Sequence, residues 1–195
     1  MFFKKSNDEL TEKLEQLFVQ EPNSKIDKKI FNLATQLVNE NTNNHKALYI
    51  LAQCYHMGIG TSVDYEKAIE LYDNLIKNEN FDTEDENFQF KFATVLRETN
   101  NNRCLVWYYY ASLNGHQYST FLIGSLLLES DLMIDIPYAV RYDLAIMFLQ
   151  KAIQMNKDSE ITNIANDCLS LMQSKHKIKK LEIEKQNQIF SLLNK

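Results

Sequence analysis

Seven side chains in this sequence have the chemistry expected of nucleophiles, bases or transition-metal ligands: Cys54, Cys104, Cys168, His45, His56, His116 and His176. No histidine has a second histidine or a glutamate four residues away, the spacing that a zinc site on one helix needs. Cys54 and His56 are two residues apart on one predicted helix, so their side chains point about 200° apart and cannot form a local nucleophile–base pair. A cysteine paired with a distant histidine stays an open alternative. We expect no catalytic residue, no metal site and no cofactor.

The aromatic run from Trp107 to Tyr110 is a second candidate, because stacked rings can bind nucleic-acid bases. No arginine or lysine is interleaved with it, and the chain carries a net charge of −5. Nucleic-acid binding needs a basic surface, so we expect no nucleic-acid partner. Trp107 and Tyr108 fall at predicted core positions. Tyr109 and Tyr110 are predicted to point away from the core, where packing and partner contact are both open.

The elements that hold these residues are predicted to be helices. Between Ala47 and Lys77 an apolar helical stripe ends at Gly58 and Gly60, which favour the backbone geometry that closes a helix. Asp64 is placed to cap the helix that follows. Four glycines and two prolines in 195 residues are too few for a turn-rich β fold, so the composition also favours an all-α chain.

This helix pair recurs along the chain, as a shift of about 38 residues shows. The same apolar spacing returns around Ile30 to Val38, Phe88 to Ala111 and Ser119 to Ile153. The N-terminus has no secretory signal pattern, and no apolar run is long enough to span a bilayer. We therefore expect a cytoplasmic protein with reduced cysteines and no membrane partner.

The first complete copy resembles the Sel1-like repeats, which are related to the tetratricopeptide repeats. The residues that carry the resemblance are Ala47, Leu51, Ala52, Tyr55, Gly58, Gly60, Asp64, Lys67, Ala68 and Tyr72. Ala52 stands where the family prefers glycine, and Gly124 keeps that glycine in the third copy. The resemblance implies one domain over residues 1–195: a right-handed superhelical α-solenoid of antiparallel helix pairs with a C-terminal capping helix. The approximate repeats are 8–40, 45–80, 84–115, 117–156 and 159–195, the last including the cap.

In such a solenoid, the resemblance implies that the first helix of each repeat lines the concave side. Positions predicted to lie off the buried stripe there include Tyr49, Gln53 and His56, with counterparts in the later copies. Packing between repeats and partner contact are both open for these positions. The candidate partner-binding residues are Tyr49, Gln53, His56, Phe90, Arg97, Tyr109, Tyr110 and Phe121, since aromatic and arginine side chains dominate protein interfaces. The apolar segment 131–141 is predicted to be a loop that either binds a partner or packs on the solenoid.

These features predict a non-enzymatic module that binds another protein through a concave groove, as a monomer or weak dimer. Short bacterial Sel1-like proteins include immunity proteins, so the resemblance also implies a possible toxin-neutralising role. An acidic protein would meet a basic toxin or effector quickly. The alternatives are a regulatory adaptor or scaffold with several partners and, from another class, a hydrolase that uses Cys54 or His56.

Overall fold

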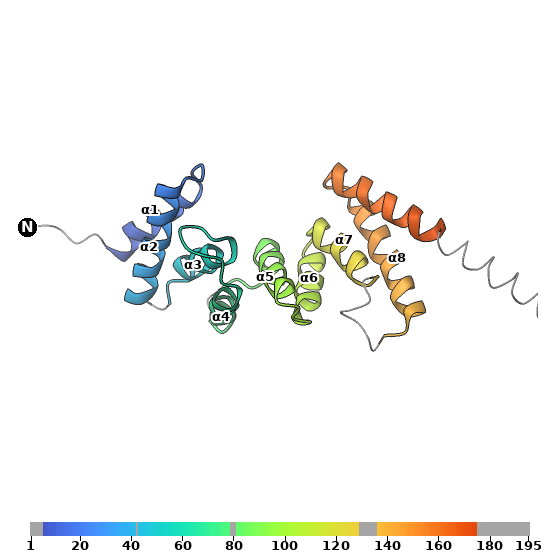
Figure 1. Ribbon diagram of the computed structural model, residues 1–195, viewed down its shortest axis with the longest axis horizontal. Coiled ribbons are helices and arrows are strands. Elements are labelled where there is room, and N and C mark those ends of the chain that lie inside the picture. The colour runs from blue at the N-terminus through green and yellow to red at the C-terminus, as the bar shows by residue number, and fades with distance from the viewer. Residues whose placement is uncertain (1–5, 42, 79–80, 129–135, 175–195) are drawn as a thin grey trace, which may run out of the picture. The chain divides into compact units, whose positions relative to one another are not determined.

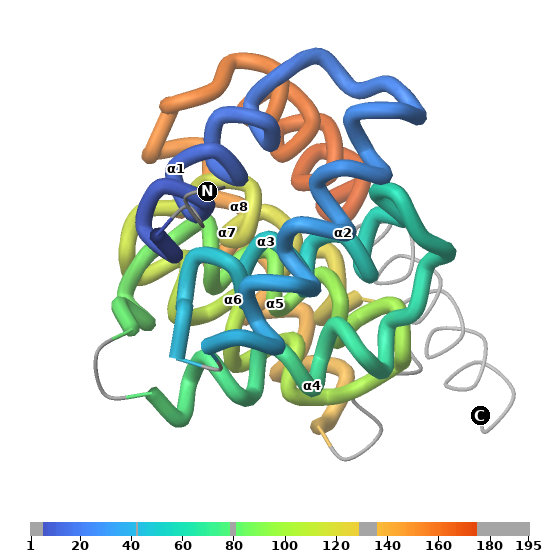
Figure 2. The backbone as a smooth tube through the Cα atoms, turned by 90° about the vertical axis from the view of Figure 1, so that its left-hand side faces the viewer, coloured from blue at the N-terminus to red at the C-terminus, as the bar shows by residue number. Residues whose placement is uncertain are grey.

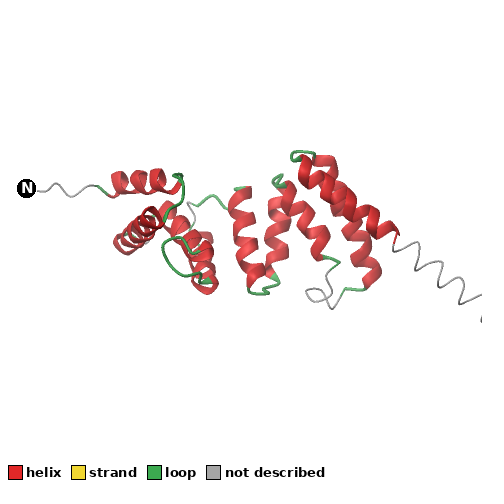
Figure 3. Cartoon of the chain, turned by 45° about the horizontal axis from the view of Figure 1, so that its top comes forward, coloured by secondary structure: helices red, strands yellow, loops and turns green. Residues whose placement is uncertain are grey.

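The computed structural model describes residues 6–41, 43–78, 81–128 and 136–174, and over these residues the chain forms helices and loops without strands (Figure 3). The chain divides into two compact units, Met1–Trp107 and Tyr108–Lys195. The prediction of an all-α fold is confirmed for the described residues. The predicted single domain and its five repeat boundaries stay a prediction.

In its described residues, the first unit contains five complete helices: α1 (Asn7–Phe18), α2 (Ser24–Glu40), α3 (His45–Met57), α4 (Tyr65–Ile76) and α5 (Glu86–Glu98). Each begins at a polar residue whose side chain accepts a backbone N–H of the first turn. These capping residues are Ser6, Asn23, Asn44, Asp64 and Asp85. The capping role predicted for Asp64 is confirmed, since its Oδ1 accepts the N–H of Lys67 at 3.1 Å.

Consecutive helices of this unit pack on one another, from α1 against α2 through to α4 against α5, as Figure 1 shows. This serial packing is the arrangement of an α-solenoid, in which each helix pair covers the apolar side of the next. Two groups of packed side chains connect the described helices of this unit. One joins the first three helices through Leu14, Ile30, Ala34, Leu37, Ala47 and Leu51. The other joins Tyr72, Phe88, Phe92 and Trp107 through ring contacts of 5.1 to 6.2 Å between centroids.

The turn between α3 and α4 forms as the two glycines predict, and its trace can be followed in Figure 2. Gly58 ends α3 in the left-handed conformation with φ of 73°, and Gly60 has φ of 71°. The Ile59 N–H returns to the Cys54 carbonyl at 2.9 Å, and the Asp64 N–H reaches the Tyr55 carbonyl at 2.8 Å. The turn therefore satisfies carbonyls at the end of α3 and positions the cap of α4.

Helix α6 (Arg103–Leu113) runs from the end of the first unit into the second, which also contains α7 (Gln117–Leu126) and α8 (Tyr138–Met155). Helices α7 and α8 pack closely because Gly124 leaves room for Leu149. A further helix spans the described residues 159–174. Gln117 joins it to α8 through hydrogen bonds to the Ala152 carbonyl and the Thr162 hydroxyl, both 2.9 Å long.

Two sequence predictions fall partly or wholly outside the described residues. The predicted loop 131–141 is wrong at its end, because α8 already begins at Tyr138 after Pro137, whose fixed φ suits a helix start. Residues 131–135 of that segment lie outside the described residues. So does the predicted capping helix beyond residue 174.

Candidate functional site

The first helices of two successive pairs, α3 and α5, carry four of the predicted partner-binding residues on side chains that are not fully buried. Tyr49 and His56 come from α3, and Phe90 and Arg97 come from α5; all four are half-buried. Lys91 of α5 joins them by donating a hydrogen bond to the Gln53 side chain of α3. We call Tyr49, His56, Phe90, Lys91 and Arg97 the α3–α5 face.

Tyr49 is the aromatic centre of this face. Its ring lies 6.2 Å from those of Tyr72 and Phe88, so one side of it belongs to the core between repeats. The Lys91 ammonium lies 5.4 Å from the ring centroid, within the range of a cation–π contact. Burial, with a smaller effect of the Asp85 carboxylate, raises the pKa of Tyr49 to about 12. The phenol is therefore neutral at physiological pH and keeps its O–H as a donor.

Gln53 departs from the sequence prediction. It was expected off the buried stripe, but its side chain is only 1% exposed. The reason is that Gln53 faces Lys91, whose Nζ donates to its Oε1 at 2.5 Å. The Nε2 group of Gln53 is buried without a partner among the described residues. Gln53 therefore holds Lys91 in position and cannot itself contact a partner in this conformation.

The same correction applies to Phe121, which was also predicted to lie off the buried stripe. It is 9% exposed, and the ring of Tyr118 stacks on it with centroids 6.0 Å apart. Nearly every side chain of α7 is buried, so this short helix offers no open face at the predicted position. Tyr109 and Tyr110, in the same unit, are exposed as predicted, at 44% and 45%. Whether any of these residues binds a partner stays a prediction.

His56 lies at the end of α3 with its ring 6.2 Å from that of Tyr65. Burial lowers its pKa, the nearby Glu98 carboxylate opposes this, and Lys91 adds to it. The imidazole is therefore held in its neutral form, and its Nδ1 is buried without a partner among the described residues. A neutral imidazole on this face can donate or accept a hydrogen bond.

Lys91 is the residue that the sequence reasoning missed. It follows Phe90 directly and has no distinctive spacing, since one lysine on a helix is ordinarily solvent-exposed. Its spacing from Gln53 gives no signal either, because Lys91 stands 38 residues after Gln53 whereas α3 and α5 begin 41 residues apart, at His45 and Glu86. Burial lowers the pKa of Lys91, and Asp85 opposes this shift.

A nucleophile based on Cys54 is disfavoured by its surroundings. The thiol is 0% exposed, and burial together with the Asp27 carboxylate raises its pKa to about 12. Burial likewise raises the pKa of Cys104. The thiolate is the reactive form, so burial favours the less reactive thiol form of both cysteines. In the described parts of the chain, no group of three histidine, cysteine or acidic side chains could hold a metal ion. No helix among these residues is long and apolar enough to cross a membrane.

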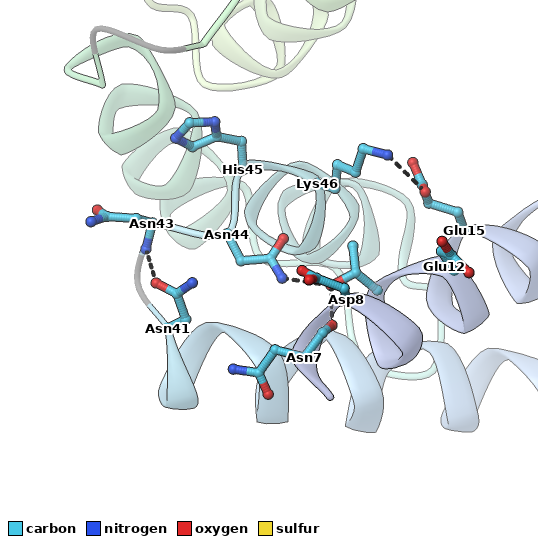
Figure 4. Close-up of a pocket in the computed structure, with 10 residues that line it drawn as sticks. Asn7, Asp8, Glu12, Glu15, Asn41, Asn43, Asn44, His45 and Lys46 are labelled. Carbon is cyan, nitrogen blue, oxygen red and sulfur yellow. Dashed lines mark hydrogen bonds and ion pairs between the residues drawn. The ribbon is translucent and has the colours of Figure 1, made fainter. Parts of the chain in front are cut away.

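An acidic pocket of about 430 Å³ lies where the starts of α1 and α3 meet (Figure 4). Asp8, Glu12 and Glu15 line it together with the asparagines that precede α3. Asn44 donates to the Thr11 hydroxyl at 2.7 Å, and Lys46 pairs with Glu15 at 2.9 Å. These contacts join the two helices. The pocket is lined by three acidic side chains and one lysine, Lys46.

The family comparison agrees with the helix pairs. A family model described as the Sel1 repeat matches residues 45–75, 95–116 and 137–157. The first match begins at the start of α3 and ends within α4, and the third covers α8. A search of curated proteins found no match.

Among solved structures, the chain is similar to the crystal structure of immunity protein Pa5087 from Pseudomonas aeruginosa. The alignment covers 88% of this chain and 84% of that one, with 14% sequence identity and a TM-score of 0.34. These values are too low to extend that protein's role to this chain.

Proposed function

Because the chain is a Sel1-like repeat protein, a class whose modules bind other proteins, we propose that it is a non-enzymatic cytoplasmic module that binds one partner protein along the first helices of its repeats. The observation that carries this proposal is the α3–α5 face. Two aromatic rings, an imidazole, an ammonium and a guanidinium are half-buried there on neighbouring helices. Half-buried side chains are already ordered, so a partner that covers them loses less conformational entropy on binding.

The residue types of this face also support protein recognition. Tyrosine and arginine are enriched among the residues that contribute most to binding energy. The lowered pKa of His56 and the raised pKa of Tyr49 keep both groups neutral, so covering them does not desolvate a charge. The charged groups Lys91 and Arg97 then set which partner surface fits.

For the identity of the partner, we propose a basic toxin or effector that this chain neutralises. The net charge of −5 and the acidic pocket beside Asp8, Glu12 and Glu15 support a basic partner, since complementary charge speeds encounter. A neutralising protein is dedicated to one target, and so the complex should contain one partner in fixed proportion. A regulatory adaptor would instead hold several partners weakly.

Co-expression tests this proposal. The tagged chain is produced together with the products of neighbouring genes and purified at low and at high salt. We expect one protein to co-purify in a constant ratio and to survive high salt, because contacts at a desolvated interface are less screened than those between exposed charges. Several proteins that are lost at high salt would indicate an adaptor. The absence of any complex in both conditions would argue against the proposed function.

A further inference from the structure

Lys91 is held in place by neutral groups only. Its Nζ donates to Gln53 Oε1 at 2.5 Å and lies 5.4 Å from the Tyr49 ring centroid. Among the described residues, no carboxylate lies within ion-pair distance of this ammonium. Asp85 acts on it at longer range, and the Asp85 Oδ1 already accepts the N–H of Phe88 at 2.6 Å.

Lys67 in the same unit is a useful contrast. Its Nζ also lies over a tyrosine, 5.2 Å from the Tyr55 ring centroid, but Asp64 Oδ2 is 3.2 Å away. The bond to Asp64 raises the pKa of Lys67, whereas burial lowers the pKa of Lys91. Lys67 is an exposed lysine with its counter-ion, and Lys91 is a half-buried lysine that lacks one.

The buried side chain of Gln53 also indicates that Lys91 is held in a fixed position. A buried amide with one group unpaired is costly, and a leucine at this position would pack without that cost. The Gln53 side chain is 1% exposed, its Nε2 has no partner among the described residues, and its Oε1 is used by Lys91. Gln53 therefore fixes the direction of the ammonium at the expense of its own second hydrogen bond.

We propose that Lys91 is the binding site for one carboxylate of the partner, with Gln53 and Tyr49 orienting the ammonium. This inference rests on the proposed function and adds the chemistry of one contact. A half-buried ammonium has lost part of its hydration, and an incoming carboxylate restores a charge-assisted hydrogen bond. The carboxylate comes from an aspartate or glutamate side chain or from a chain end.

A singly charged anion suits this site better than a phosphate. Phosphate recognition favours arginine forks or several cations, whereas one ammonium provides a point charge. The nearby Asp85 carboxylate, which acts on both Tyr49 and Lys91, would also repel a dianion more strongly. The net charge of −5 does not oppose this contact, because charges farther than a Debye length of about 8 Å are largely screened at physiological salt.

A random dodecapeptide library displayed on phage tests the inference without a known partner. The wild-type chain is the bait, and the enriched sequences are aligned. We expect them to share an aspartate or glutamate at one fixed position. The selected peptide is then synthesised with this residue as glutamate or glutamine, and with a free or an amidated C-terminus, to separate a side-chain carboxylate from a terminal one.

Affinities are compared for the wild-type chain, Lys91→Met and the matched control Lys67→Met, after thermal melting has shown that each is folded. For the wild type and for Lys67→Met, we expect removal of the recognised carboxylate to weaken binding about tenfold, the size of one charge-assisted hydrogen bond. For Lys91→Met the same removal should leave the affinity unchanged. Two results would overturn this inference and leave the proposed function standing. One is a set of peptides without a shared acid, and the other is an equal loss of affinity in Lys91→Met when the carboxylate is removed. If the wild type enriches no peptide, the inference fails, and the proposed function is decided by the co-expression experiment.

Discussion

Gly60 lies directly against the backbone of Asp27. A Cβ atom at Gly60 would be 2.2 Å from the Asp27 carbonyl oxygen and 2.9 Å from the Cβ of Phe31. The turn between α3 and α4 therefore touches α2, so a glycine that ends one helix also sets how closely two helix pairs approach. Part of the stability of the first unit depends on this contact.

Gly60→Ala should destabilise the chain by about 3 kcal/mol, because it combines a left-handed backbone conformation with overlap against backbone atoms that cannot move aside. Gly58→Ala is the matched control. It has a similar φ of 73°, but the added Cβ comes no closer than 3.2 Å, to a side-chain methyl of Val63. We expect it to cost about 1 kcal/mol. Urea unfolding followed by circular dichroism measures both, and equal costs would show that the Asp27 contact is unimportant.

Gly124→Ala tests the packing of α7 on α8. Alanine favours a helix by about 1 kcal/mol over glycine. Here, however, its Cβ would lie 2.9 Å from Leu149 Cγ and 3.2 Å from the Ala145 carbonyl. We expect a net loss of about 1 to 2 kcal/mol in the free energy of unfolding.

The double-mutant cycle with Leu149→Ala identifies the cause of that loss. If the overlap with Leu149 is responsible, Leu149→Ala should cost less in the Gly124→Ala background than in the wild type. Additive effects of the two substitutions would show that the loss comes from elsewhere.

Gln117 is expected to be the most important buried polar side chain of the second unit. Its amide donates to the Ala152 carbonyl and the Thr162 hydroxyl, and its Oε1 accepts the Asp158 N–H at 2.6 Å. Gln117→Leu leaves the Ala152 carbonyl, the Asp158 N–H and the Thr162 hydroxyl without that partner and should cost about 2 to 3 kcal/mol. Thr162→Ala removes one of the four hydrogen bonds of the Gln117 side chain and should cost about 1 kcal/mol or less. Urea unfolding compares them, and a neutral Gln117→Leu would contradict this role.

Stability at alkaline pH should depend on Tyr49. Its folded pKa of about 12 lies above the ordinary value of 10, so folding favours the neutral phenol. This contribution is complete below about pH 10 and is lost as the pH rises through the folded pKa, because the unfolded chain releases the proton first. Tyr72 acts in the same direction, since burial raises its pKa as well.

Unfolding measured at about pH 8, 10 and 11 should therefore show the free energy of unfolding falling above pH 10. Tyr49→Phe keeps the ring but cannot ionise, and it should flatten this fall without removing it, since Tyr72 and Cys54, whose pKa values are also raised by burial, remain. A variant whose alkaline profile matches the wild type would contradict the assignment to Tyr49.

The helices and their ends were predictable from the sequence because each depends on local chemistry. Gly58 and Asp64 mark a helix end and a helix start through backbone geometry and capping, and both predictions are confirmed. The start of α8 was missed because the apolar residues around Tyr138 are as compatible with a partner-binding loop as with a first helical turn.

The candidate site was predictable only in part. Tyr49 lies on the α3–α5 face as its helical position suggested, but the burial of Gln53 depends on Lys91 from the next helix pair. Helical periodicity within α3 carries no information about that neighbour. For the same reason the missing counter-ion of Lys91, which separates it from Lys67, follows from tertiary contacts alone.

The most direct test of the account is the affinity for the co-purified partner of two double variants, measured by isothermal titration calorimetry. Phe90→Ala/Arg97→Ala removes two side chains of the α3–α5 face, and Val19→Ala/Val63→Ala removes two exposed apolar side chains outside α3 and α5 in the same unit. The account predicts that the first pair weakens binding by about 100-fold or more, and that the second changes it by less than about threefold. Equal affinities for both double variants, each folded as the wild type is, would contradict it.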